Sequence, residues 1–129
     1  GLREVGVQLD LALTSPYVRA HETAELLCAG LRPKPKLVVI DALAPGRKPA
    51  DVIAAVARHS AAGRGASRVA LVGHEPDLGE LAARLLGARG ALEFKKGAVC
   101  RIDVDRAMPA GPGTLRWLLT PRVLRGLAP

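Results

Sequence analysis

The sequence predicts an α/β fold in which a mostly parallel sheet is covered by helices on both faces. Residues 69–72 form a short, β-branched apolar run, which is typical of a strand buried on both sides. Ser15-Pro16 marks a helix start, because serine can cap a helix and proline fits the next position. Strand-like and helix-like segments alternate along the chain, as they do in folds with a parallel sheet.

Each element follows from a local pattern. Residues 7–14 alternate apolar and polar side chains with the period of a strand. The helix that begins at Ser15-Pro16 is expected to reach about Ala29 and to end at Gly30, with an apolar side made of Val18, Ala20, Ala24, Leu26 and Leu27. The later elements are expected as a strand at 37–40, helices at 50–59 and 76–86, the strand at 69–72, and strands at 99–104 and 115–119.

Length and composition limit the class of protein. The 129 residues fit one domain, 1–129, which is long enough to bury a single core. No apolar run reaches the ~18 residues of a membrane span. The start has no signal-peptide character, so a cytoplasmic protein with no membrane partner is expected. Cys28 and Cys100 are far apart and not in metal-ligand spacing, which favours reduced thiols.

The net charge of +7 could attract a polyanion. Arginines are scattered along the whole chain, however, and Tyr17, Phe94 and Trp117 do not interleave with a basic cluster, as stacking on single-stranded nucleic acid requires. We therefore expect no nucleic-acid partner. A phosphorylated protein is a second partner that the same charge would attract.

Two strand ends carry residues suited to anion binding. His74 follows the strand at 69–72 and precedes a helix, whose amino end favours anions. Arg19 falls in the first turn of the helix after residues 7–14, where a guanidinium can bind phosphate through two parallel hydrogen bonds. Ligands of open α/β sheets bind beyond the carboxyl ends of the strands, so parallel neighbouring strands would bring Arg19 and His74 to one crevice.

The same residues also have structural interpretations. Arg19 taken alone could be a surface arginine, and His74 a histidine satisfied within the core. Glu75 and Asp77 could only complement the dipole of the helix that follows. Ser15 is a poor candidate for a nucleophile, because it lacks a G-x-S-x-G setting and already serves as a cap.

Two motifs resemble those of a known family. Residues 14–24, Thr-Ser-Pro-Tyr-Val-Arg-Ala-His-Glu-Thr-Ala, resemble the S-P-x-x-R-A-x-x-T-A motif of the histidine phosphatase superfamily. Residues 72–76, Val-Gly-His-Glu-Pro, resemble its second-histidine motif, G-H-x-P. Residues 92–98 and 115–121 are similar to the small SixA-like phosphohistidine phosphatases, so the resemblance covers nearly the whole chain.

The resemblance implies a three-layer α/β/α sandwich and a two-step reaction without metal or cofactor. A histidine takes the phosphoryl group, and water then hydrolyses the phosphohistidine intermediate. By this resemblance Arg19 binds the phosphate and His74 stabilises the transferring group. Ser15 and Glu75 are further candidates for phosphate binding. His74 is not the nucleophile in this scheme.

The sequence departs from the family at the nucleophile. That histidine lies in an R-H-G motif after the family's first strand, and no such motif is present here. His21 lies in the variable part of the arginine motif, and Arg58-His59-Ser60 ends a helical pattern with no strand before it. We therefore expect the chain to lack the first strand and most of the first helix of the fold, and to be inactive as given.

The predicted function is that of a SixA-like phosphohistidine phosphatase, a monomer that acts on a phosphohistidine-bearing protein. One alternative is a non-catalytic pseudophosphatase that binds phosphate or phosphoproteins. Another is a phosphatase for small phosphate esters within the same superfamily. Those relatives generally carry a further acid and longer insertions over the pocket, and no such insertion is seen in this sequence.

Overall fold

The computed structural model describes residues 1–61, 68–104 and 112–127 of the chain. Its elements follow one another as β1 (Leu11–Thr14), α1 (Val18–Gly30), β2 (Lys36–Val39), η1 (Asp41–Leu43, a 3-10 turn), α2 (Pro49–Ala61), β3 (Val69–Val72), α3 (Asp77–Leu85), β4 (Val99–Asp103), β5 (Thr114–Leu119) and α4 (Pro121–Leu127). This order confirms the predicted alternation of strands and helices. The sequence patterns did not indicate η1 or α4, and β1 is shorter than the predicted strand at 7–14.

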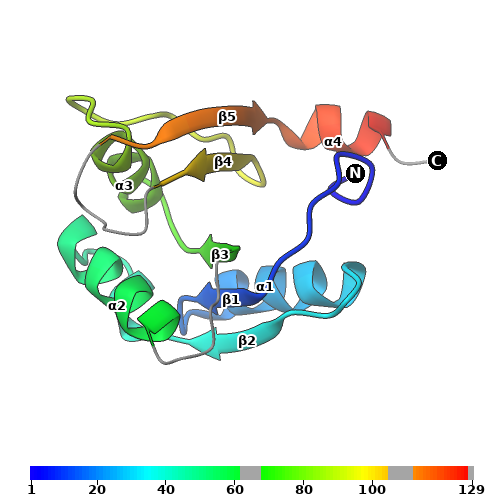
Figure 1. The fold of residues 1–129 in the computed structure, drawn as a ribbon, viewed down its shortest axis with the longest axis horizontal. Coiled ribbons are helices and arrows are strands. Elements are labelled where there is room, and N and C mark those ends of the chain that lie inside the picture. Colours follow the sequence, from blue (N-terminus) through cyan, green and yellow to red (C-terminus); the bar gives the residue numbers. More distant parts are fainter. Residues whose placement is uncertain (62–67, 105–111, 128–129) are drawn as a thin grey trace.

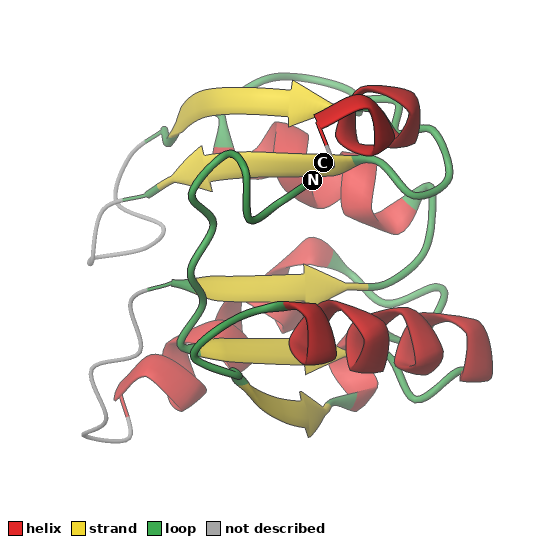
Figure 2. Ribbon diagram, turned by 90° about the vertical axis from the view of Figure 1, so that its right-hand side faces the viewer, coloured by secondary structure: helices red, strands yellow, loops and turns green. Residues whose placement is uncertain are grey.

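The parallel strands β2, β1 and β3 form one sheet, with β1 in the centre. Every residue of β1 is buried, and Leu13 has no exposed surface. A second sheet pairs β4 with β5 in antiparallel register. Within the described residues β3 and β4 each pair on one side only, and Figure 2 shows them as the facing edges of the two sheets. The mostly parallel α/β fold is thus confirmed, with its strands divided between two sheets.

Helices lie on both faces of the strands, which gives three layers. In Figure 2 helix α1 lies in front of the parallel sheet, while α2 and α3 lie behind the strands. Figure 1 shows residues 1–10 leading from the vicinity of α4 down to β1. No helix among the described residues is long and apolar enough to cross a membrane.

The two helix layers pack in different ways. Between the parallel sheet and helices α2 and α3 lies a core of large aliphatic side chains, namely Leu11, Leu13, Leu43, Val52, Ile53 and Leu81. Helix α1 instead buries the small residues Ala20, Ala24 and Cys28. Small side chains allow the helix backbone to approach the sheet closely. The parallel sheet is therefore covered on both faces, as its apolar strands require.

The predicted apolar side of α1 is partly wrong. Val18 and Leu26 are 70% and 76% exposed, whereas Ala20 and Ala24 are buried as expected. The buried stripe continues to Cys28, at a spacing of four residues, and so turns Leu26 towards solvent. Burial of the small residues thus decides how the helix is oriented, not the position of its largest apolar side chains.

Neither cysteine forms a disulfide in the structure, as expected. Cys28 lies on the buried face of α1, and Cys100 on β4 is half-buried. Desolvation raises the pKa of both thiols, with a smaller opposing effect of Lys34 on Cys28. Both thiols are accordingly held in the protonated, less nucleophilic form.

Charged side chains link the antiparallel strands β4 and β5. Asp103 on β4 accepts a hydrogen bond from Nε of Arg116 on β5 at 2.7 Å and another from Nε of Arg101 at 3.0 Å. These bonds, that from Arg116 first, lower the pKa of the Asp103 carboxyl. The ionised carboxylate thus links the two strands on the exposed side of their sheet.

Candidate anion-binding site

Ser15 and His74 meet at the carboxyl ends of two neighbouring parallel strands. Thr14, the last residue of β1, lies opposite Val72, the last residue of β3. The ladder extends one step further, because the Ser15 amide donates to the Val72 carbonyl at 2.9 Å. Beyond these ends the Ser15 Oγ lies 2.8 Å from Nε2 of His74. The two motifs picked out in the sequence are thus joined by a hydrogen bond.

Ser15 is held from several directions. It has no exposed surface, and its Oγ accepts a hydrogen bond from the Tyr17 amide at 3.1 Å. The hydroxyl of Thr14, which is equally buried, donates to the Ser15 carbonyl at 3.1 Å. These contacts fix the turn between β1 and α1. The prediction that Ser15 caps the helix is wrong, because α1 begins at Val18 and its N-cap residue is Tyr17.

His74 is half-buried and has an aromatic neighbour. The ring of Tyr17 meets the imidazole edge-on, with 5.4 Å between the ring centroids and 68° between the planes. This geometry is one that aromatic pairs favour. Tyr17 itself is 56% exposed, so it stands at the rim of the site. No pattern in the sequence indicates this contact, because the two rings come from different turns.

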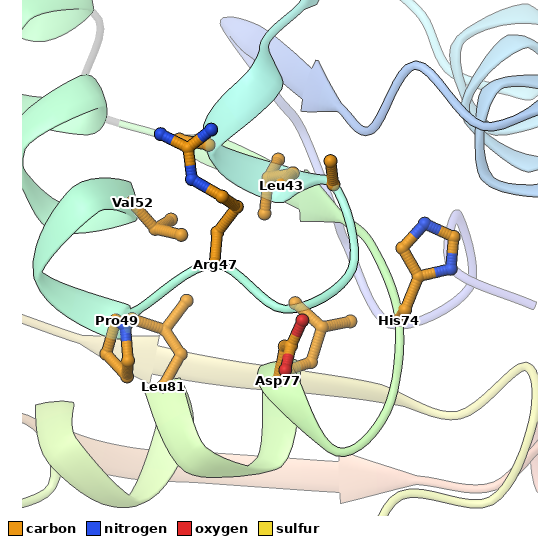
Figure 3. Close-up of a pocket in the computed structure, with 10 residues that line it drawn as sticks. Leu43, Arg47, Pro49, Val52, His74, Asp77 and Leu81 are labelled. Atoms are coloured by element: carbon orange, nitrogen blue, oxygen red, sulfur yellow. The ribbon is translucent and has the colours of Figure 1, made fainter.

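A small pocket that His74 helps to line lies between the loop after η1 and the amino end of α3 (Figure 3). It is lined by Leu43, Arg47, Pro49, Val52, Asp77, Leu81 and their neighbours. The Asp77 carboxylate accepts a hydrogen bond from the Gly46 amide at 2.8 Å, which ties this loop to α3. Figure 3 shows the Arg47 guanidinium extending away from His74, and its Nε lies 3.6 Å from Asp51.

Arg19 lies in the first turn of α1, at the same end of the sheet as Ser15 and His74. Its side chain is exposed and forms no ion pair or hydrogen bond with any described residue. The first turn of α1 contains no acidic residue. A free guanidinium beside the positive end of a helix is an arrangement that favours an anion. That Arg19 and His74 bind one anion together stays a prediction.

Glu75 precedes α3 and forms a hydrogen bond with the first turn of that helix. Its Oε1 accepts a hydrogen bond from the Gly79 amide at 2.9 Å, in the first turn of α3. Helix α3 begins at Asp77 in the structure, one residue later than predicted, with Pro76 as the residue before it. The bond accounts for one Glu75 oxygen at the helix end. A direct role of Glu75 in phosphate binding stays a prediction.

The remaining histidines lie apart from this hydrogen-bonded pair. His21, in α1, pairs through Nδ1 with Glu25 at 3.0 Å. His59 lies in the last turn of α2. Among the residues that the structure describes, no group of three or more His, Cys, Asp or Glu side chains could hold a metal ion. A guanidinium such as that of Arg19 is able to bind an anion, and the His74 imidazole is able to donate or accept a proton.

Comparison with known proteins points to one fold family. The structure of the protein histidine phosphatase SixA complexed with tungstate matches with a TM-score of 0.81 and 26% sequence identity, over 95% of this chain and 76% of that one. A structure assigned to phosphohistidine phosphatase SixA from Nakamurella multipartitia matches with a TM-score of 0.71 over 93% of this chain and 75% of that one. At 20% identity the second match concerns the fold alone.

Sequence comparison adds one relative. An uncharacterized protein from Picosynechococcus sp. is 39% identical over 101 residues, which are 76% of this chain and 59% of that protein. The chain thus spans less than two thirds of the curated relative that it matches. No family model matches the sequence.

Proposed function

We propose that this chain, which belongs to the SixA-like group of the histidine phosphatase superfamily, supplies the phosphate-binding part of a phosphohistidine phosphatase. The observation that carries the proposal is the hydrogen bond between Ser15 and His74 at the ends of two adjacent parallel strands. It joins the arginine motif and the second-histidine motif at one place. The likeness to a protein histidine phosphatase supports the same class of reaction.

Arg19 and His74 have different tasks in this reaction. The guanidinium binds two oxygens of the phosphoryl group and offsets their charge. The His74 imidazole donates a hydrogen bond to another oxygen as the group passes from substrate to enzyme. In the first step a nitrogen–phosphorus bond forms on the nucleophilic histidine while that of the substrate breaks. In the second step water attacks phosphorus, and phosphate leaves with the nucleophile restored.

No nucleophile is assigned to the 129 residues of this sequence. The three histidines are His21, His59 and His74. The first pairs with Glu25 on α1, the second ends α2, and the third bonds Ser15. We therefore expect this chain by itself to bind the phosphoryl anion without turning over substrate.

Two measurements on the purified chain test the proposal. Calorimetric titration with tungstate, an anion that mimics phosphate, should show binding that phosphate displaces. Phosphate release from a phosphohistidine-bearing protein and from p-nitrophenyl phosphate should stay at the uncatalysed rate. Absence of tungstate binding would contradict the site. Turnover of phosphohistidine would contradict the missing nucleophile, and turnover of the phenyl ester alone would favour a small-molecule phosphatase.

A non-catalytic phosphate-binding module is the second candidate. It is favoured because His74 is the one histidine at the site among the described residues, whereas His21 and His59 lie elsewhere. The coding sequence upstream of Gly1 distinguishes the two functions. A strand ending in R-H-G there supports the enzyme, because it would supply the nucleophile. Upstream sequence without any such histidine supports the binding module.

A further inference from the structure

The hydroxyl of Ser15 has two neighbours and no exposure to solvent. Its Oγ lies 3.1 Å from the Tyr17 amide nitrogen and 2.8 Å from Nε2 of His74. Ser15 is 0% exposed. A serine hydroxyl can donate one hydrogen bond and accept two. Which partner receives the single proton therefore decides the protonation of the His74 ring.

The direction of the hydrogen bond between Ser15 and His74 follows from which neighbouring atoms can accept the Ser15 proton. The Tyr17 amide is a donor, so its contact occupies a lone pair of the Ser15 oxygen. Among the described residues the only acceptor within reach of the Ser15 proton is Nε2 of His74. If Nε2 carried the proton, the buried Ser15 hydroxyl would lack an acceptor, which is unfavourable. The geometry thus favours a neutral ring that is protonated at Nδ1.

We propose that Ser15 is a positioning residue, which holds His74 as the Nδ1–H tautomer and fixes the orientation of its ring. The amide of Ser15 donates to the carbonyl of Val72, the last residue of β3, so Ser15 is held against the strand that His74 follows. The edge of the Tyr17 ring limits rotation of the imidazole from a second side. Ser15 acts through His74 in this account, because burial and two occupied bonds keep its hydroxyl from the anion.

The consequence for the site concerns the other ring nitrogen. With Nε2 accepting from Ser15, Nδ1–H is the free donor that a phosphoryl oxygen would meet. A ring that turned, or that changed tautomer, would present a lone pair to the anion and repel it. This last step rests on the proposed function, whereas the tautomer itself does not.

The test is nitrogen NMR on the chain with ¹⁵N-labelled histidine, at a pH where the imidazoles are neutral. Long-range ring correlations should report His74 as the Nδ1–H tautomer. Ser15→Cys keeps nearly the same volume but removes the strong donor, and Ser15→Ala removes it altogether. In both variants the population ratio of the Nε2–H to the Nδ1–H tautomer of His74 should rise at least about 5-fold, which is the bias expected from one buried hydroxyl. His21 and His59 should be unchanged in the same spectra.

Tungstate titration of the same variants completes the test, with a 5- to 50-fold loss of affinity expected as an order-of-magnitude estimate. An Nε2–H ring in the unsubstituted chain, or one unaffected by Ser15→Cys, would overturn the proposal. If Ser15→Ala does not fold, the unsubstituted chain and the cysteine variant still decide. If the tautomer is as proposed but tungstate does not bind, Ser15 keeps its role and the proposed function fails.

Discussion

Replacement of Arg19 by alanine should weaken anion binding without affecting the fold. The Arg19 side chain is exposed and contacts no described residue through an ion pair or hydrogen bond. Its backbone carbonyl keeps the bond from the Thr23 hydroxyl at 2.9 Å in the variant. The melting temperature should therefore stay at the value of the unsubstituted chain, which makes this a clean change at the site.

The size of the effect follows from the bonds that Arg19 can offer. A hydrogen bond to a charged group contributes about 1.5–3 kcal/mol, and solvent around an exposed guanidinium favours the lower end. Arg19→Ala should therefore raise the dissociation constant for tungstate about 10- to 30-fold. The dissociation constant of Arg19→Lys should lie between those of the unsubstituted chain and Arg19→Ala, because lysine keeps the charge and loses the planar pair of donors.

Arg84→Ala is the matched control. Arg84 is an exposed arginine in the last turn of α3, far along that helix from His74. Its removal lowers the net charge by the same single unit, so it measures the general electrostatic contribution alone. Calorimetry at constant ionic strength should show near-unchanged affinity for Arg84→Ala. Equal losses in both variants, or no loss in Arg19→Ala, would refute the assignment of Arg19.

Three further predictions concern the fold. Gly79→Ala should lower the free energy of unfolding in urea by about 2 kcal/mol or more, because the added Cβ would overlap the Leu92 carbonyl oxygen. Gly30→Ala has open space around it and should instead raise this free energy by about 0.5–1 kcal/mol. Asp103→Asn should lower stability at neutral pH. Since the pKa of Asp103 is lowered in the folded state, this loss of stability should vanish as the pH falls through that pKa. A loss that is independent of pH would contradict the ion pairs. Cys28, which is 1% exposed and has a raised pKa, should react with a thiol reagent only after unfolding, so rapid labelling of native Cys28 would contradict its burial.

The elements could be predicted because their signals are local. The strand at residues 69–72 needs only near neighbours to be recognised, and β3 spans the residues that the pattern indicated. Ser15-Pro16 likewise predicts a helix locally, but α1 begins later, at Val18. That the turns after β1 and β3 lie together follows from one more step, since parallel strands place their carboxyl ends at the same edge. The hydrogen bond between Ser15 and His74 at that edge was not predicted. Element ends were less accurate, as for β1, whose ladders to β2 and β3 begin at Leu11 although the alternating pattern begins at Val7.

What the sequence could not supply depends on contacts between distant segments. The edge-on contact of Tyr17 with His74 joins two turns, and no spacing within either turn indicates it. The predicted apolar side of α1 is partly wrong because close packing on the sheet selects the small residues of the helix, which leaves Val18 and Leu26 exposed. The tie between Asp77 and the Gly46 amide was hidden for the same reason, because an acid in a first helical turn already has a local explanation.

The position of bound tungstate tests the central claim most directly. In a crystal structure of the chain with tungstate, the anion should lie beyond the ends of β1 and β3. Its oxygens should be within hydrogen-bond distance of the Arg19 guanidinium and of Nδ1 of His74. Tungstate bound elsewhere at saturating concentration, with those two side chains free, would contradict the account.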